Sequence, residues 1–214
     1  MTWPLVDIGD LVDRVTSWNP LQSNSDTPFF YIDLSSIDKD EKELREDSVF
    51  KILPKEAPSR ARQLVVVGDV LVATVRPNLN GVALVPNFLD GATASTGYCV
   101  LRPKVDLLDC RYLFYWTRGQ IFITEMIKKA TGANYPAVSD RIIKESKIPL
   151  PPLMEQKRIV TILDKADSIR SKRKLAIELA DEFLRAVFLD MFGDPVTNPK
   201  GWKMTPLGAH GEFK

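Results

Sequence analysis

The stretch Ile148-Pro149-Leu150-Pro151-Pro152 divides this sequence into two parts of different character. The segment behind it, Leu153 to Phe192, contains no proline and no glycine and is rich in charged residues, which is typical of one long helix. Gly193 can adopt the left-handed conformation that often ends a helix, and Pro195 cannot continue one. The sequence therefore predicts a long helix directly after a proline-rich boundary.

Apolar residues recur every three or four positions along this helix and form a heptad seam. A helix of this length spans about 60 Å, whereas a small domain is about 30 Å across. The seam therefore needs a second long helix, from another copy, from a partner or from a second half of a duplicated chain. The alternative is a helix folded back on itself, but no glycine or proline marks a fold point. The seam residues are Ile159, Ile162, Ala166, Ile169, Arg173, Ala176, Ala180, Phe183 and Val187.

The part before the boundary has the pattern of a mixed domain. Five short β-rich runs are expected to be strands: Phe29 to Leu34, Leu64 to Val67, Val70 to Val75, Val82 to Val85, and Tyr98 to Leu101, the last ended by Arg102-Pro103. One helix is expected after the capping residue Asp109, and another from Ile121 to Ala130. We expect an α+β fold, with a mixed α/β domain over residues 1–150, the long helix over 151–193 and a tail over 194–214.

The composition excludes several classes of protein. The chain has 214 residues, of which 44% are apolar, and it contains no run of about 18 apolar residues, so no membrane-spanning helix is expected. The start, Met1-Thr2-Trp3-Pro4-Leu5, lacks the pattern of a signal peptide. Cys99 and Cys110 are interpreted as free thiols of a cytoplasmic protein. A net charge of +1 excludes a uniformly basic surface but not a local basic face.

Motifs for the common chemistries of DNA-modifying enzymes are missing. Asn19-Pro20-Leu21 and Asn198-Pro199-Lys200 fail at the third position of the Asn-Pro-Pro-aromatic motif of amino-methyltransferases, and no P-loop is present. Glu145-Ser146-Lys147 has the Glu-x-Lys spacing of metal-dependent nucleases, but no suitable upstream carboxylate accompanies it. A single histidine, His210, makes a Ser-His-Asp site improbable. We expect no catalytic residue and no metal site.

Two stretches are locally basic. Lys51 to Asn80 and Lys128 to Lys147 each carry five cations against two anions. In the first, an arginine and two asparagines follow a predicted strand; arginine can read guanine O6 and N7, and asparagine can read adenine N6 and N7. In the second, two lysines precede a Thr-Gly-Ala-Asn-Tyr-Pro loop that could close on a sugar-phosphate backbone. The candidate DNA-binding residues are Arg60, Arg62, Thr74, Arg76, Asn78, Asn80, Lys128, Lys129, Thr131, Asn134 and Tyr135.

Each of these stretches also has a structural interpretation. The first could be a turn in which Arg76 forms a salt bridge, and the second a plain loop with a packed Tyr135. The acidic residues between Asp33 and Asp47 are interpreted as a solvated, partner-facing surface.

Five stretches together resemble the specificity subunits of type I restriction-modification systems. The most specific is Ile148-Pro149-Leu150-Pro151-Pro152-Leu153-Met154-Glu155-Gln156-Lys157-Arg158-Ile159, which resembles the family's entry into its helical spacer. The others are Ala57 to Arg62, Gly68 to Asn78, Ser95 to Pro103 and Asn134 to Ser139.

The resemblance implies a non-catalytic subunit in which a target recognition domain reads one half of a bipartite DNA sequence. Such subunits usually carry two recognition domains, each followed by a long helix, and the helices pair antiparallel. Methyltransferase subunits dock on this frame, and a translocase-nuclease subunit joins for restriction. S-adenosylmethionine, and ATP and Mg for restriction, are expected in those partner subunits, with no cofactor bound by this chain.

The sequence departs from that pattern by carrying one predicted domain and one long helix. Trp3 is followed six residues later by Gly9, and Trp202 by Gly208, as if a second unit began after the helix. We therefore expect a half-length subunit that forms a homodimer through the helix and reads an interrupted palindrome. Two alternatives remain open: a coiled-coil adaptor without a DNA role, and a detached recognition module of a fused restriction-methylation enzyme.

Overall fold

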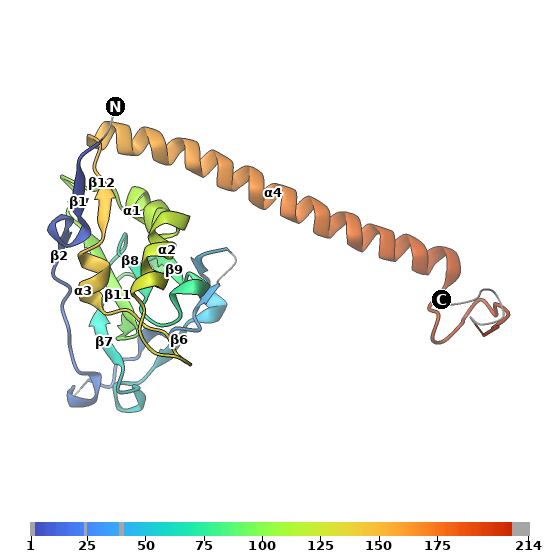
Figure 1. Ribbon diagram of the computed structural model, residues 1–214. Helices are drawn as coiled ribbons and strands as arrows, with labels where there is room; N and C mark the ends of the chain where they lie inside the picture. Colours follow the sequence, from blue (N-terminus) through green and yellow to red (C-terminus); the bar gives the residue numbers. More distant parts are fainter. Residues whose placement is uncertain (1–2, 24, 39–40, 207–214) are drawn as a thin grey trace. The chain divides into compact units, whose positions relative to one another are not determined.

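The structure, a computed structural model, describes residues 3–23, 25–38 and 41–206. It divides into two units, Met1–Leu163 and Asp164–Lys214, and the division falls inside the long helix α4 (Leu153–Phe192) (Figure 1). The domain boundaries predicted at residues 150 and 193 stay predictions. The repeat that relates Trp3 and Gly9 to Trp202 and Gly208 depends on Gly208, which lies outside the described residues.

Unit 1 is built on two four-stranded sheets (Figure 1). The first has the antiparallel order β2-β11-β8-β9. The second has the order β6-β3-β10-β7, in which only β10 and β3 run parallel. Two ribbons pair β1 with β12 and β4 with β5. The strands are β1 (Leu5–Asp7), β2 (Val12–Asp13), β3 (Phe29–Ile32), β4 (Ile37–Asp38), β5 (Glu43–Leu44), β6 (Phe50–Ile52), β7 (Ala61–Leu64), β8 (Val70–Ala73), β9 (Val82–Leu84), β10 (Thr93–Ser95), β11 (Tyr98–Pro103) and β12 (Lys147–Pro149).

The central strands of the first sheet are buried on both faces, which explains their unbroken apolar runs. In β8, Val70 and Val72 point into one apolar cluster and Leu71 into the other, because successive side chains of a strand alternate between faces. The same alternation places Cys99 in the first cluster and Tyr98 in the second. The first sheet is therefore the middle layer, with helices on one face and the second sheet on the other.

Three helices cover the outer face of this middle layer: α1 (Cys110–Thr117), α2 (Gln120–Lys129) and α3 (Asp140–Lys144). The Asp109 side chain accepts hydrogen bonds from two N–H groups of the first turn of α1, which confirms the predicted cap. The predicted helix Ile121 to Ala130 is also confirmed, shifted by one residue. Short 3-10 helices are formed by Ile8–Leu11, Pro20–Gln22, Glu46–Ser48, Pro54–Glu56, Pro77–Leu79 and Asn87–Leu89.

The predicted strand Leu64 to Val67 was placed wrongly, because β7 ends at Leu64. The Val65 N–H donates to the Ala92 carbonyl at 2.9 Å, but the following two N–H groups bond to side chains. Val66 donates to Asp69 Oδ2 at 2.9 Å, and Val67 donates to Asp90 Oδ1 at 2.9 Å. A run of valines predicts a strand, but the nearby Asp69 and the distant Asp90 compete for its backbone donors.

The predicted end of the strand at Arg102-Pro103 was also wrong, because β11 continues through both residues. They pair with the edge strand β2, Arg102 opposite Asp13 and Pro103 opposite Val12. Proline is tolerated at the end of a strand, where its missing N–H costs no ladder bond.

The first turns of α4 pack into unit 1. Gln156 is fully buried, and its amide makes three hydrogen bonds to backbone groups: it accepts from Asp109 N–H at 2.9 Å and donates to the carbonyls of Leu107 and Pro151, both at 2.9 Å. Val160, one turn later, is 7% exposed and belongs to the core under the helices. The start of the helix is thus fixed by the domain that precedes it.

The end of α4 lies in unit 2, and the following residues satisfy its last carbonyls. Gly193 adopts φ +78° as predicted, and its N–H donates to the Leu189 carbonyl. Lys200 Nζ donates to the carbonyls of Asp190 and Met191, and Trp202 Nε1 donates to that of Phe192. These bonds supply partners that the last turn of a helix lacks.

Candidate nucleic-acid interface

The two loops that the sequence marked as basic and polar lie against each other. Val75 forms an antiparallel bridge with Ala137, and the N–H of Val138 donates to the Thr74 carbonyl at 2.8 Å. The N–H of Arg76 donates to the Pro136 carbonyl at 2.7 Å. The segments 74–80 and 131–138 are distant in sequence, and these contacts join them into one surface.

Arg76 occupies the centre of this surface in a strained backbone conformation. Its φ of +51° is left-handed, which costs a residue with a Cβ atom about 1–2 kcal/mol. Its guanidinium lies over the Tyr135 ring, with Cζ 4.6 Å from the ring centroid. Tyr135 is 68% exposed, so the expected alternative of a packed tyrosine is not what the structure shows. Strain of this kind concentrates at binding sites.

A groove of about 530 Å³ opens beside the Arg76–Tyr135 pair. It brings Arg60 from the turn before β7 together with Arg76 and Tyr135, three of the predicted DNA-binding residues. Among the described residues, neither Arg60 nor Arg76 forms an ion pair, so their charges remain available to a ligand. The groove is lined by Asp33, Leu34, Ser35, Ile37, Arg60, Ala73, Val75, Arg76, Leu79, Gly81 and Tyr135.

Three other predicted contact residues use their side chains within the protein. Arg62 donates to Asn19 Oδ1 at 2.7 Å, and the Thr74 hydroxyl donates to the Gly97 carbonyl at 2.9 Å. Asn80 donates its amide to the Arg118 carbonyl at 3.2 Å and takes a left-handed φ of +48°. The hydrogen bonds of these three side chains stabilise the loops around the groove.

The remaining predicted contact residues are exposed. Asn78 lies in the turn after Arg76, and Thr131 and Asn134 lie in the loop that carries Tyr135. Lys128 and Lys129 end α2, where cations also interact favourably with the helix dipole. Lys129 is held by Glu125 one turn earlier, at 2.6 Å, which leaves Lys128 as the more available cation.

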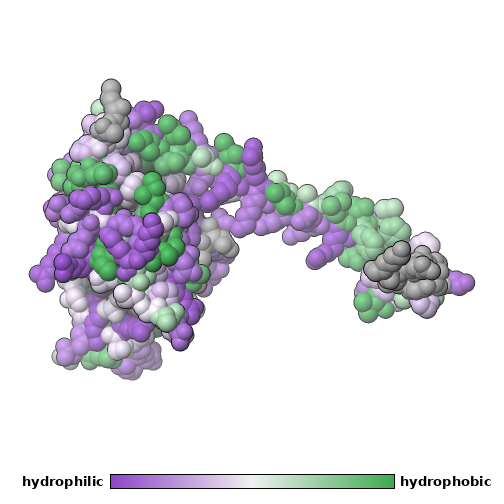
Figure 2. All heavy atoms as spheres, in the orientation of Figure 1, coloured by the Kyte–Doolittle hydropathy of each residue, from purple (hydrophilic) through white to green (hydrophobic). Residues whose placement is uncertain are grey.

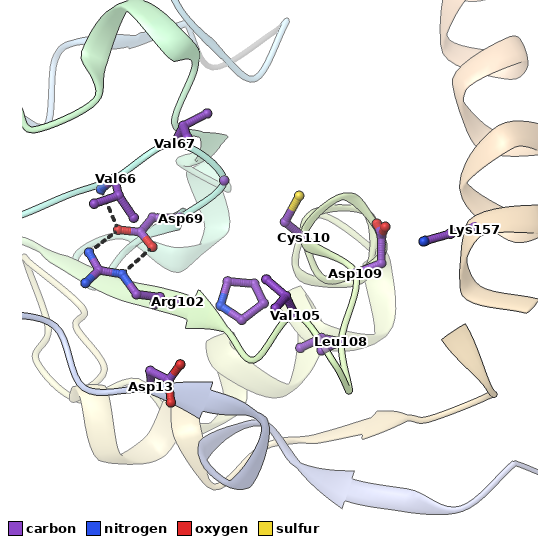
Figure 3. Close-up of a pocket in the computed structure, with 12 residues that line it drawn as sticks. Asp13, Val66, Val67, Asp69, Arg102, Val105, Leu108, Asp109, Cys110 and Lys157 are labelled. Carbon is purple, nitrogen blue, oxygen red and sulfur yellow. Dashed lines mark hydrogen bonds and ion pairs between the residues drawn. The ribbon is translucent and has the colours of Figure 1, made fainter. Parts of the chain in front are cut away.

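A second cavity, of about 490 Å³, has a different chemistry (Figure 3). At its side, the buried Asp69 carboxylate accepts from Arg102 Nε at 2.9 Å and from a terminal nitrogen of Arg102 at 2.7 Å. Asp69 also accepts from the Val66 N–H. The charges of Asp69 and Arg102 are therefore paired with each other inside the fold. The hydrogen bond to Asp69 raises the pKa of Arg102, and burial raises the pKa of the Cys110 thiol nearby. This cavity is bordered by structural residues.

The residues with the Glu-x-Lys spacing of metal-dependent nucleases form separate interactions and do not converge on one site. Glu145 pairs with Arg141 at 2.6 Å, Lys147 pairs with Asp7 at 2.9 Å, and the buried Ser146 donates to the Ile143 carbonyl. Over residues 3–23, 25–38 and 41–206, no group of three or more metal-binding side chains is found. None of the helices in this part of the chain combines the length and apolarity needed to cross a membrane.

A mixed sheet-and-helix domain that leads into one long helix is the architecture of solved specificity subunits. The chain matches the HsdS subunit from Thermoanaerobacter tengcongensis with a TM-score of 0.71 and 33% identity, over 95% of this chain and 52% of that one. A chain from a structure of complex assembly and conformational transition in the type I R-M system matches with a TM-score of 0.75 and 33% identity, over 96% of this chain and 52% of that one.

Residues 68–180 match the family described as "Type I restriction modification DNA specificity domain", and the chain belongs to this family. The MjaVIII specificity subunit of Methanocaldococcus jannaschii is 32% identical over 108 residues, which cover 50% of this chain and 25% of that protein. The MjaIX specificity subunit of the same organism is 26% identical over 195 residues, covering 84% and 41% respectively. The chain thus spans less than half the length of these curated relatives.

Asp33 and Ser35 are groove residues that the sequence did not mark as a site. Asp33 was grouped with the following acidic residues as a solvated surface, whereas the structure places its turn at the groove. A polar turn directly after an aromatic strand is the signal that could have indicated it.

Proposed function

We propose that this chain is a DNA-recognition subunit that reads one half of a bipartite target through the groove lined by Arg60, Arg76 and Tyr135. The observation that supports the proposal best is the pairing of segments 74–80 and 131–138, which brings Arg76 and the exposed Tyr135 ring together at a groove that Arg60 also lines. Arginine suits bidentate contacts to guanine, and exposed loops on a rigid scaffold are where recognition residues concentrate.

The test is duplex binding as a function of salt. A DNA-recognition subunit binds mixed-sequence duplex at low salt, and the logarithm of its affinity falls linearly with the logarithm of salt concentration as counterions are released. Arg60→Ala should reduce this slope by about 1, as expected for the loss of one phosphate contact. An adaptor without a DNA role would show no salt-dependent affinity. A matched control is Arg185→Ala, which removes the same charge from α4.

We further propose that two copies associate through α4. The seam residues Ile162, Ile169 and Phe183 are 53%, 54% and 67% exposed. Further large apolar residues outside the predicted seam are also exposed, and they gather on the C-terminal half of α4 (Figure 2). A helix that is apolar on several faces is normally buried. Pairing through the predicted seam alone would therefore leave many apolar side chains of this half exposed to solvent. The additional residues are Leu175, Ile177, Leu179, Leu184, Phe188, Leu189, Met191 and Phe192.

Methyl transfer and restriction are assigned to partners. A methyltransferase subunit with S-adenosylmethionine, and a translocase-nuclease subunit with ATP and Mg, would act on the DNA that this chain selects. The similarity to specificity subunits and to a chain from a type I assembly supports this division of labour. The purified chain should therefore transfer no methyl group and cut no DNA by itself; methylation of duplex DNA by the chain alone would contradict the proposal.

A further inference from the structure

The groove is lined by an acidic side chain as well as by two arginines. Asp33 lines it together with Arg60 and Arg76, and it follows β3 in a turn closed by the Ser36 N–H, which donates to the Asp33 carbonyl at 3.0 Å. The Tyr98 hydroxyl donates to the same carbonyl at 2.7 Å, and Tyr98 is 1% exposed. A carboxylate in a DNA-binding groove repels phosphate, so its presence at a fixed position calls for a specific partner.

The carboxylate of Asp33 retains the capacity to accept further hydrogen bonds. Tyr31 Oη donates to its Oδ1 at 3.2 Å, and Ser35 Oγ lies 3.5 Å from its Oδ2. Two ionised oxygens offer about four acceptor positions. Asp33 forms no ion pair with any described residue, so the two long contacts orient it without neutralising its charge.

The Arg76 guanidinium is held by Tyr135 and forms no ion pair with Asp33. The Arg76 guanidinium stacks on the Tyr135 ring, and its left-handed backbone is fixed through the bond to Pro136. Stacking uses the face of the planar guanidinium and leaves its edge, with the donor groups, free. One groove is therefore lined by both a donor fork and an acceptor carboxylate.

We infer that this pair reads one G·C base pair from the major groove. Arg76 donates to guanine O6 and N7, and Asp33 accepts from the cytosine N4 amino group of the same pair. Those are the groups that each base presents in the major groove. The reversed C·G pair would place an acceptor opposite the carboxylate. An A·T pair would do the same and would also remove the second acceptor that guanine offers to Arg76. Arg60, at the same groove, then contacts the backbone. The inference rests on the proposed DNA-recognition function and names the base pair that it selects.

The experiment first selects bound duplexes from a random pool with the full chain and then modifies the selected G·C pair in each half-site. Replacing guanine by 7-deazaguanine removes the N7 acceptor, and N4-methylcytosine blocks the exposed N4–H. We expect each modification to weaken wild-type binding about tenfold. Asp33→Ala should lose its sensitivity to N4-methylcytosine while it keeps its sensitivity to 7-deazaguanine, and Arg76→Ala should show the opposite pattern.

Asp47→Ala is the matched control, because it also removes one acidic charge, from an exposed side chain that pairs with Arg45. It should leave both sensitivities unchanged, and thermal melting checks that each variant is folded. Equal sensitivity of Asp33→Ala and wild type to N4-methylcytosine, or a selected half-site without a required G·C pair, would overturn this inference and leave DNA recognition intact. Absence of salt-dependent duplex binding would overturn the proposed function itself.

Discussion

The long helix α4 packs one face into unit 1 at its start and is exposed along its C-terminal half, although it is one continuous element. In its first turn Gln156 is 0% exposed and satisfies three backbone groups, whereas in its C-terminal half Leu175 and Phe183 are 55% and 67% exposed. The first turns are stabilised by contacts within their own unit. The second half exposes large apolar side chains that no contact within the chain covers, and the proposed association would supply that cover.

The largest effect is expected at the buried end. Gln156→Leu leaves the Asp109 N–H and the carbonyls of Leu107 and Pro151 without partners, which should lower the free energy of unfolding by about 3–5 kcal/mol. Urea denaturation followed by circular dichroism measures it. The neighbouring Lys157→Ala, at an exposed position, should stay within about 0.5 kcal/mol of wild type. Equal stability of the two variants would show that the buried amide contributes nothing.

A somewhat smaller effect, on a different quantity, is expected at the exposed end. Phe183→Ala should weaken self-association about thirtyfold, equivalent to about 2 kcal/mol, because it removes an apolar side chain from the paired surface. Sedimentation or light scattering over a concentration series measures it. Unfolding of unit 1 should be unchanged, and Arg185→Ala, away from the seam, should associate like wild type. A wild-type chain that stays monomeric at micromolar concentration would refute the association.

The smallest expected effects are losses of DNA affinity that distinguish the roles of the two predicted DNA-binding loops. Arg76→Ala should weaken binding to the selected site by about 1.5 kcal/mol and binding to random duplex much less, as expected for a base contact. Lys128→Ala should weaken both equally and reduce the salt slope by about 1. Competition assays at two salt concentrations distinguish them. If Arg76→Ala reduced both affinities equally, Arg76 would be a phosphate contact or a folding residue.

Local patterns were sufficient to predict the elements whose stability is local. The helix from Leu153 to Phe192, its end at Gly193 and the Asp109 cap all follow from residues close in sequence, and all are found in the structure. The end of β7 could not be predicted in this way, because it also depends on Asp90, which is distant in sequence and accepts from the Val67 N–H. β10 and the short α3 were also missed, since three to five residues carry too little periodicity.

The sequence predicted individual residues of the candidate site but not their arrangement in space. Arg76 and Tyr135 were identified separately, and nothing in the sequence says that one stacks on the other. Asn80 and Arg62 have the same residue types as base-reading side chains, yet they hold loops together. Residue type indicates what a side chain can bind, and only tertiary contacts decide whether that capacity remains free.

The central claim is that one recognition domain and its helix, used twice, read DNA. Selection of bound duplexes from a random pool by the full chain tests it most directly. The account predicts a short half-site that appears twice in inverted orientation with a fixed spacer. One heptad inserted between Ile169 and Ala176 should lengthen that spacer by about 10 Å, or about three base pairs. No enriched sequence, or a single asymmetric site whose length ignores the insertion, would contradict it.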